Sequence, residues 1–236
     1  RVHAQIMGSG PDLVLIHGAV GSLQDFTYDL MPRLAERYRV IAFDRPGLGY
    51  TDRTDPAYAS TFARDGASPA EQAALLADAA RKLGAEKPIV AGHSFGGIVA
   101  MAWALEQDPA AVVMLAGVAM PWPGDLGWIY QVDTHIGPYM PLRLGAFRAN
   151  ARQVNHLRPH VVKMSARYPD LTLPIEIVHG DLDDTVPLTV HSGPMSDLIA
   201  SANLTVLEGV GHMPHHADPE AAIAAIDRAA ERAGLR

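Results

Sequence analysis

The sequence predicts an α/β protein built on a doubly wound, mostly parallel sheet. The chain contains a series of short, continuous apolar runs, each of which ends at or beside a Gly or an Asp. Runs without polar alternation are typical of strands buried on both faces of a parallel sheet. Helical patterns lie between the runs, and strands and helices that alternate in this way require right-handed βαβ crossovers.

Six of the apolar runs are predicted strands. They are Leu13–His17, Val40–Asp44, Pro88–Gly92, Ala111–Gly117, Ile175–Gly180 and Leu204–Gly209. The first residues of the chain, Arg1–Met7, alternate more between apolar and polar side chains. Alternation is typical of a strand with one solvated face, so we expect an antiparallel strand at an edge of the sheet.

Four helical patterns separate these strands. They cover Asp25–Arg37, Ser68–Leu83, Phe95–Gln107 and a last helix from Asp218 to Arg232. The second is the clearest, because Ser68 is a suitable N-cap, Pro69 suits the first helical position and Glu71 completes a capping box. The last helix opens on Asp-Pro-Glu, which is a helix start signal.

Two stretches interrupt the alternation of strands and helices. Thr51–Ala67 is polar and rich in turn residues, which predicts a loop. Met120–Leu173 has no strand pattern, and a structureless loop of that length is unusual inside a compact domain. We therefore expect a helical cap at residues 120–173, inserted into a core made of residues 1–119 and 174–236.

Composition limits the class of protein. The chain has 236 residues, 48% apolar and 19% charged, which indicates a globular protein rather than a disordered one. The net charge of −7 and the scattered basic residues argue against nucleic acid or an anionic membrane as a partner. We expect a small-molecule substrate instead, and nothing in the sequence favours one oligomeric state.

The absence of cysteine excludes a disulfide framework, a thiolate zinc site and a cysteine nucleophile. No apolar run approaches the 18 or so residues of a membrane span. We recognise no signal peptide and expect a cytoplasmic protein. The chain starts at Arg1 without a methionine, which is compatible with a targeting segment that has been removed.

A nucleophile motif lies between a predicted strand and a predicted helix. Residues 92–96 read Gly-His-Ser-Phe-Gly and match G-x-S-x-G. In the strand–turn–helix context this motif forms a tight elbow that lifts the serine oxygen above the sheet. Ser94 is therefore the candidate nucleophile. A serine N-cap in a Gly-rich turn is the alternative interpretation.

A serine hydroxyl needs a base that is held by a third group. An acidic loop, Gly180–Pro187, follows the strand Ile175–Gly180, and His212 follows the run Leu204–Gly209. Both lie past the carboxyl ends of strands, where open α/β sheets place their sites. The chain order Ser, Asp, His also agrees with the elbow motif. In the acidic loop Asp181, Asp183 and Asp184 are candidates for the acid.

Taken together, these motifs resemble the α/β-hydrolase superfamily over essentially the whole chain. The matching segments are His17-Gly18, Asp44–Gly49, the elbow around Ser94, the acidic loop and Gly211-His212. The resemblance implies an α/β-hydrolase fold of the serine-nucleophile branch, which includes esterases and haloperoxidases. In the family the second aspartate of G-D-x-D-x-x-x-P is the acid, which implies Asp183 with His212 as the base.

The family also implies an oxyanion hole made of backbone N–H groups. One donor is the residue after the nucleophile, Phe95. The other lies after His17-Gly18 and is Ala19 by resemblance, with Val20 as the alternative. His17 and His93 are expected to be structural hydrogen-bonding residues. No metal or organic cofactor is needed for this chemistry.

A histidine cluster near the end of the chain offers a different interpretation. His212, His215, His216 and Asp218 supply metal-ligand types at short spacing. The catalytic interpretation already accounts for His212, so we expect no metal at this cluster. His215 and His216 are treated as surface residues.

The expected function is that of a carboxylesterase that acts on small to medium acyl esters through an acyl-enzyme. Residues expected to line the substrate pocket are Val20, Met120, Trp122, Trp128, Tyr139 and Met213. Packing of the cap onto the core is the alternative role for the cap residues. Other possible activities are a C–C bond hydrolase, a cofactor-free haloperoxidase or perhydrolase, and a hydrolase-fold ligand receptor with slow or no turnover.

Overall fold

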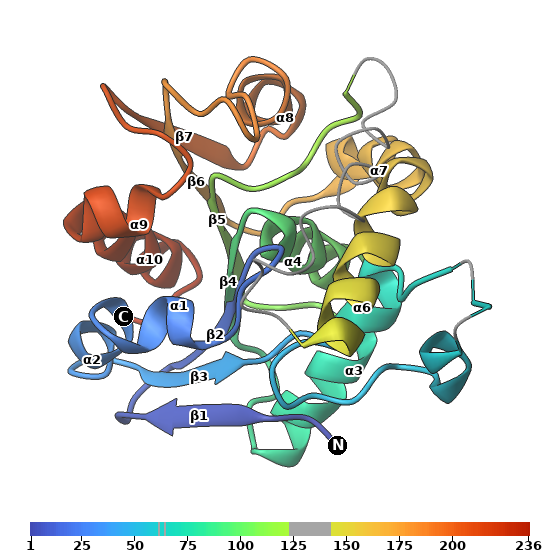
Figure 1. Ribbon diagram of the computed structural model, residues 1–236. Helices are drawn as coiled ribbons and strands as arrows, with labels where there is room; N and C mark the ends of the chain where they lie inside the picture. Colours follow the sequence, from blue (N-terminus) through green and yellow to red (C-terminus); the bar gives the residue numbers. More distant parts are fainter. Residues whose placement is uncertain (61, 64, 123–142) are drawn as a thin grey trace.

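The computed structural model describes residues 1–60, 62–63, 65–122 and 143–236 of the chain. Its centre is a seven-stranded sheet with the strand order β1-β3-β2-β4-β5-β6-β7 (Figure 1). The strands are β1 (Ala4–Met7), β2 (Asp12–Ile16), β3 (Arg39–Phe43), β4 (Ile89–His93), β5 (Ala111–Leu115), β6 (Ile175–Gly180) and β7 (Ala202–Leu207). The predicted fold class is thus confirmed.

Strand β1 lies at an edge of the sheet and differs from the others in direction. It pairs antiparallel with β3, with Ala4 opposite Phe43 and Met7 opposite Val40. The remaining pairs, from β3–β2 to β6–β7, are parallel. The alternation of Arg1–Met7 therefore predicted the edge strand correctly.

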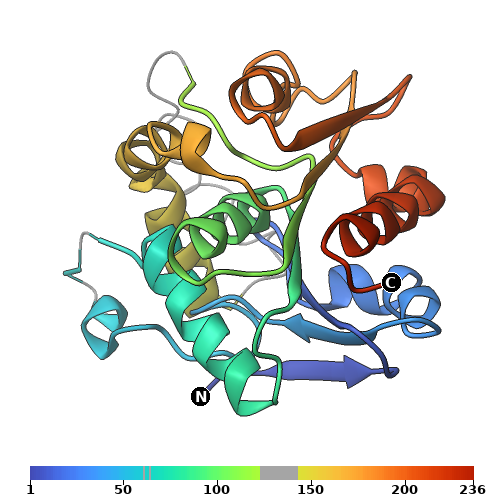
Figure 2. The ribbon, with the colours of Figure 1, turned by 180° about the vertical axis from the view of Figure 1, so that it is seen from behind.

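The parallel strands are buried because helices cover both faces of the sheet (Figures 1 and 2). Val14 and Ile16 of β2 pack into one core with residues of α3 (Pro69–Lys82) and α4 (Phe95–Glu106). Leu13 and Leu15 of the same strand pack into a second core with α2 (Leu30–Leu34) and α10 (Pro219–Arg232). Successive side chains of a strand point to opposite faces, which explains why one apolar run serves both cores.

Helix α3 carries the predicted capping box. The Ser68 hydroxyl accepts the N–H of Glu71, and the Glu71 carboxylate accepts the N–H of Ser68. Asp218 caps α10 by accepting the N–H of Ala221 at 3.0 Å. The N-termini of α3 and α10 are therefore capped as the sequence predicts.

The prediction of one continuous helix over Asp25–Arg37 is wrong. The structure contains two short helices instead, α1 (Gln24–Thr27) and α2. The break is explained by Pro32. A proline inside a helix has no N–H to donate to the carbonyl of the residue four positions earlier, and its ring clashes with that carbonyl. Since α2 starts only at Leu30, Pro32 lies in its first turn, where no such bond is needed.

The predicted loop and the predicted cap both contain helices in their described parts. The loop carries a short 3-10 helix, η1 (Pro56–Ala59). Residues 143–173 carry α6 (Leu144–Asn155), α7 (Leu157–Ser165) and η4 (Tyr168–Asp170). Helix α6 contacts the loop after β3, where Gln153 Nε2 donates to the Pro46 carbonyl at 2.8 Å. The division into core and cap remains a prediction.

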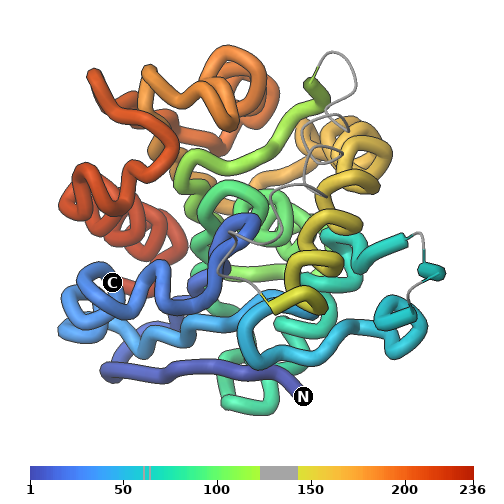
Figure 3. The backbone as a smooth tube through the Cα atoms, in the orientation of Figure 1, coloured from blue at the N-terminus to red at the C-terminus, as the bar shows by residue number. Residues whose placement is uncertain are grey.

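Two further helices follow β6 and β7. They are α8 (Ser192–Leu198) and α9 (Pro214–Ala217). After α10, the last residues lie beside the segment that follows α2, where Arg236 Nη1 lies 3.4 Å from the Tyr38 hydroxyl (Figure 3). Within the described ranges, no helix combines the length and the apolar character needed to cross a membrane.

A buried carboxylate joins α10 to the sheet and gives a first testable prediction. Glu176 of β6 is completely buried, and its oxygens accept Arg228 Nε at 2.9 Å and Arg232 Nη1 at 2.6 Å. Charged hydrogen bonds contribute about 1.5–3 kcal/mol each. We expect Glu176→Gln to lower the free energy of unfolding by about 2–3 kcal/mol, measured by urea denaturation.

The matched control is Glu208→Gln, because Glu208 is exposed on the segment after β7. This substitution should change the free energy of unfolding by less than about 0.5 kcal/mol. An equally small effect of Glu176→Gln would show that the buried ion pairs contribute no net stability.

Candidate active site

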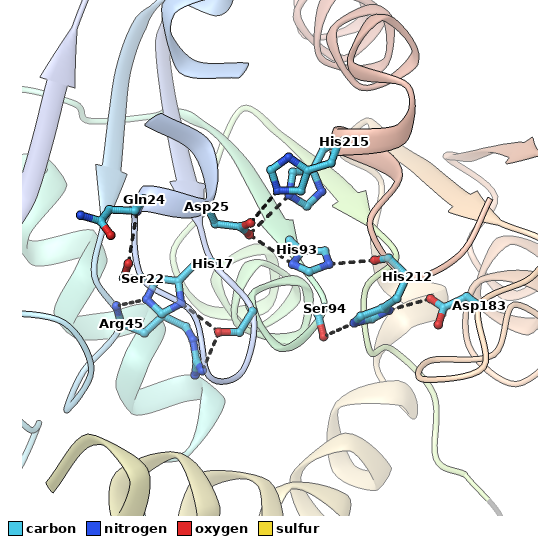
Figure 4. Close-up of polar contacts among 12 residues, drawn as sticks. His17, Ser22, Gln24, Asp25, Arg45, His93, Ser94, Asp183, His212 and His215 are labelled. Atoms are coloured by element: carbon cyan, nitrogen blue, oxygen red, sulfur yellow. Dashed lines mark hydrogen bonds and ion pairs between the residues drawn. The ribbon is translucent and has the colours of Figure 1, made fainter. Parts of the chain in front are cut away.

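Three polar side chains from distant parts of the sequence meet at the carboxyl edge of the sheet (Figure 4). Ser94 follows β4, Asp183 follows β6, and His212 follows β7. Ser94 Oγ lies 2.9 Å from His212 Nε2, and His212 Nδ1 lies 2.7 Å from Asp183 Oδ2. A chain of this kind can remove a proton from the serine hydroxyl and stabilise the resulting imidazolium.

The backbone at Ser94 is strained in the way that an elbow requires. Ser94 has φ 52° and ψ −117°, a region that non-glycine residues rarely occupy. A Cβ on Gly92 would collide with the backbone of Gly96, and one on Gly96 would collide with the carbonyl of Ile16. The two glycines therefore allow β4, α4 and β2 to approach closely behind Ser94.

Asp183 is the aspartate of the acidic loop that contacts His212. Its other oxygen accepts the N–H groups of Thr185 at 2.9 Å and Val186 at 2.8 Å. Burial by itself raises the pKa of this carboxyl, but hydrogen bonds from His179, His212 and Val186 outweigh it and hold the pKa well below its usual range. Asp183 is therefore ionised at neutral pH.

The two alternative aspartates occupy other positions. Asp181 accepts the N–H of Gly209 at 2.7 Å and so closes the turn after β7. Asp184 is exposed and lines the cavity beside the site. Neither of them takes the place of Asp183 beside His212.

Two backbone N–H groups beside the site come from different elements, since Phe95 begins α4 and Ala19 lies in the loop after β2. Within the described part of the chain, the N–H groups of Phe95 and Ala19 donate to no other residue. Val20 differs, because its N–H donates to Asn150 Oδ1 of α6 at 3.0 Å. The structure thus favours Ala19 over Val20 as a donor that is available to a ligand.

His17 and Arg45 support this loop from behind. His17 donates through Nδ1 to the Gly18 carbonyl at 2.8 Å and accepts the Arg45 N–H through Nε2 at 2.9 Å. Burial, together with the nearby Arg45 charge, lowers the pKa of His17 and keeps it neutral. The Arg45 guanidinium lies 4.2 Å from the centre of the Phe95 ring. The structural role expected for His17 agrees with these contacts.

Ser94 and His212 open into a cavity of about 1430 Å³. Of the pocket residues predicted from the sequence, Val20, Trp122 and Met213 line it. Met120 does not, because it packs against the core and donates its N–H to His191 Nδ1 at 3.2 Å. Trp128 and Tyr139 lie outside the described residues.

The sequence interpretation missed two histidines that support the site. His179 Nε2 lies 3.1 Å from Asp183 Oδ2, and it is the last residue before the Gly-Asp of the acidic loop. His191 lines the cavity, and burial lowers its pKa to about 4. The position of His179 at the end of a strand was a usable signal, whereas nothing local in the sequence marks His191.

The histidines near the end of the chain group differently from the expectation. His212 contacts Ser94 and Asp183, and Asp218 caps α10. His215 is buried rather than on the surface, and burial lowers its pKa to about 4. His215 and His216 both contact Asp25 of α1, a residue that was not singled out.

Comparisons with known proteins agree with this architecture. An uncharacterized protein of Mycobacterium tuberculosis is 27% identical over 95% of this chain and 76% of its own length. The pimeloyl-[acyl-carrier protein] methyl ester esterase of Vibrio campbellii is 26% identical over 94% of this chain and 95% of its own.

Among solved structures, a thermophilic esterase from Thermogutta terrifontis superposes with a TM-score of 0.78, at 20% identity, over 98% of this chain and 93% of its own. A putative non-heme bromoperoxidase from Mycobacterium tuberculosis has the same TM-score, at 16% identity, over 99% of this chain and 96% of its own. At these identities the superpositions establish the shared fold.

A family profile extends over most of the chain. Residues 13–226 match the Alpha/beta hydrolase family, a range that includes Ser94, Asp183 and His212. The match and the hydrolase relatives agree with the sheet order and with the elbow after β4. This chain is a hydrolase enzyme and belongs to the alpha/beta hydrolase family.

Proposed function

We propose that the protein is a serine carboxylic ester hydrolase. Ser94 Oγ attacks the carbonyl carbon of the ester while His212 Nε2 accepts the serine proton. The alcohol leaves with a proton from His212, which leaves an acyl group on Ser94. Water then attacks the acyl-enzyme with His212 again as the base, and the acid is released.

Asp183 and two backbone N–H groups have supporting roles in this mechanism. Asp183 holds the proton of His212 on Nδ1, so that Nε2 is free to accept the serine proton. The N–H groups of Phe95 and Ala19 hold the negative oxygen of the tetrahedral intermediate. One such donor contributes about 3–4 kcal/mol to lowering the barrier.

The observation that carries the proposal is the hydrogen-bonded chain from Ser94 through His212 to Asp183, in which Ser94 and His212 line the cavity. An ester substrate is supported by the name of the Vibrio campbellii relative, which acts on a methyl ester. The apolar side chains of Val20, Trp122 and Met213 around the cavity favour an apolar acyl chain, for which we propose a small to medium length.

Two measurements on the same preparation test this proposal. A fluorophosphonate should label the enzyme at one equivalent, and peptide mass mapping should locate the label on Ser94. A series of p-nitrophenyl esters from acetate to decanoate should show turnover, and the optimum chain length measures the acyl pocket.

The alternatives give different results in these measurements. Labelling of Ser94 without turnover of any p-nitrophenyl ester would contradict the esterase proposal and favour a C–C bond hydrolase or a hydrolase-fold receptor. Halogenation or perhydrolysis that exceeds ester hydrolysis would favour a haloperoxidase or perhydrolase. Absence of labelling would contradict Ser94 as the nucleophile.

Asn150 provides a prediction about the proposed oxyanion hole. Its side chain is buried, and it holds the Val20 N–H next to Ala19. Asn150→Ala removes this bond, which leaves the loop after β2 free to shift away from Ser94. We expect kcat for p-nitrophenyl esters to fall about tenfold, with a smaller change in KM, because tenfold corresponds to about 1.4 kcal/mol of transition-state stabilisation.

The control is Asn155→Ala on the same helix, since Asn155 is exposed. Its kcat should stay within about twofold of the wild type. A fall in kcat of the same size for both variants would show that α6 acts through its general stability rather than through the Val20 contact.

A further inference from the structure

Three side chains from separate elements converge beside the elbow (Figure 4). Asp25 lies on α1, His93 is the last residue of β4, and His215 lies on α9. Asp25 Oδ2 is 3.4 Å from His93 Nδ1 and 3.4 Å from His215 Nε2. The grouping shares no residue with the Ser94–His212–Asp183 chain, and the proposed ester hydrolysis uses none of its three side chains.

The two imidazoles are buried with unsatisfied nitrogen atoms. His93 is 4% exposed and His215 is 1% exposed. Within the described residues, His93 Nδ1 and His215 Nε2 contact only the Asp25 carboxylate, at 3.4 Å, and His215 Nδ1 forms no hydrogen bond. Contacts of 3.4 Å are longer than a normal hydrogen bond, and a poorly satisfied buried polar atom costs about 1–3 kcal/mol, so a ligand bound by these atoms would stabilise the fold.

His93 has the orientation of a metal ligand. Its Nε2 donates to the carbonyl oxygen of His212 at 3.0 Å, which leaves the Nδ1 lone pair directed toward Asp25. Metal-ligating histidines commonly donate their other ring N–H to a backbone carbonyl or carboxylate in this way, which fixes the tautomer. The hydrogen bond that fixes a metal-ligating histidine in this way is therefore already present at His93.

The separations between the three donor atoms suit a small divalent cation. All three atoms lie within 4.8 Å of one another, so a point about 2.4 Å or less from each of them exists. Zinc–nitrogen and zinc–oxygen bonds are about 2.0–2.2 Å long, which requires only a small inward movement. Two imidazoles and one carboxylate are donor types that zinc prefers.

We propose that Asp25, His93 and His215 form a binding site for a divalent metal ion of the zinc class. The fourth position is filled by water or by His216, whose Nε2 lies 2.9 Å from Asp25 Oδ1. The bound ion ties α1, the end of β4 and α9 together. Through the His93–His212 contact it also steadies the backbone that carries His212.

The test is a metal titration of tag-free wild-type protein after treatment with a chelator. Calorimetry with Zn²⁺ should give one equivalent bound, and Co²⁺ should give the visible absorption bands of a tetrahedral complex. The thermal midpoint of unfolding should rise with Zn²⁺, since the ion binds only the folded state. These readouts do not depend on ester hydrolysis.

The variants Asp25→Asn and His215→Gln should each weaken Zn²⁺ binding by about 100-fold or more, since even supporting contacts change metal affinity by 10–100-fold. His156→Gln is the control, because His156 is partly exposed and pairs with Asp65 elsewhere. Equal loss of affinity in His156→Gln would overturn the proposal. If one of these variants does not fold, the wild-type titration still tests the proposal. Absence of a one-to-one Zn²⁺ complex, or of the tetrahedral Co²⁺ spectrum, in the wild type would overturn it.

Discussion

Replacement of Ser94 by alanine is expected to remove ester hydrolysis almost completely. The substitution deletes the oxygen that forms the acyl-enzyme, while the proposed Phe95 and Ala19 donors and the cavity remain. Loss of the nucleophile in a serine hydrolase of this type lowers kcat by about 10⁶-fold. The fold should survive, because a smaller side chain at φ 52° adds no new clash. The measurement is kcat for the preferred p-nitrophenyl ester.

A second serine at the cavity provides the matched control. Ser22 lines the same cavity, and its hydroxyl accepts only the Gln24 N–H at 3.4 Å in the described structure. Ser22→Ala should keep kcat within about twofold of the wild type. Retention of more than a few per cent of activity in Ser94→Ala would show that another group attacks the substrate.

The double variant Ser94→Ala/His212→Ala tests whether the two residues act as one unit. Since His212 activates Ser94 across 2.9 Å, its removal should cost nothing further once the serine is gone. An additional loss of tenfold or more would mean that His212 acts on the substrate independently of Ser94.

The three residues that we propose as catalytic could be chosen from the sequence because each stands at a position that strand pattern and chain order define. Ser94, Asp183 and His212 each follow an apolar run, and parallel strands present their carboxyl ends at the same edge of the sheet. The choice among three aspartates came from the family pattern, and the 2.7 Å contact with His212 agrees with it.

Contacts between side chains of distant segments were not predictable in the same way. Asn150 and Val20 are 130 positions apart, and no local pattern links them. The grouping of Asp25 with His93 and His215 depends on how α1 and α9 pack against the end of β4. The sequence drew attention to His212, His215 and His216 as a metal cluster, where we expected no metal, because spacing along the chain does not reveal which side chains turn inward.

Which apolar residues line the cavity was also difficult to predict from the sequence. Trp122 and Met213 line the cavity, whereas Met120 packs against the core although it is only two positions from Trp122. An apolar side chain suits a core and a pocket equally well, so its type alone does not decide between them.

Replacement of Asp183 by asparagine is expected to lower kcat by about 10⁴-fold while the fold is retained. The amide oxygen of asparagine can still accept the N–H groups of Thr185 and Val186. Its NH₂ group then faces His212 Nδ1 in place of the carboxylate oxygen. A donor at this position favours the tautomer with the proton on Nε2, which cannot accept the proton of Ser94.

Asp184→Asn is the matched control, because Asp184 is the adjacent aspartate and is exposed. Its kcat should remain within about twofold of the wild type. If Asp184→Asn instead caused the large loss and Asp183→Asn did not, the acid would have been assigned to the wrong residue. Urea denaturation of both variants separates a loss of catalysis from a loss of folded protein, since only the former leaves the free energy of unfolding unchanged. A large fall in kcat for Asp183→Asn at unchanged stability therefore means that the carboxylate charge acts on His212 during the reaction, beyond its role in closing the acidic loop.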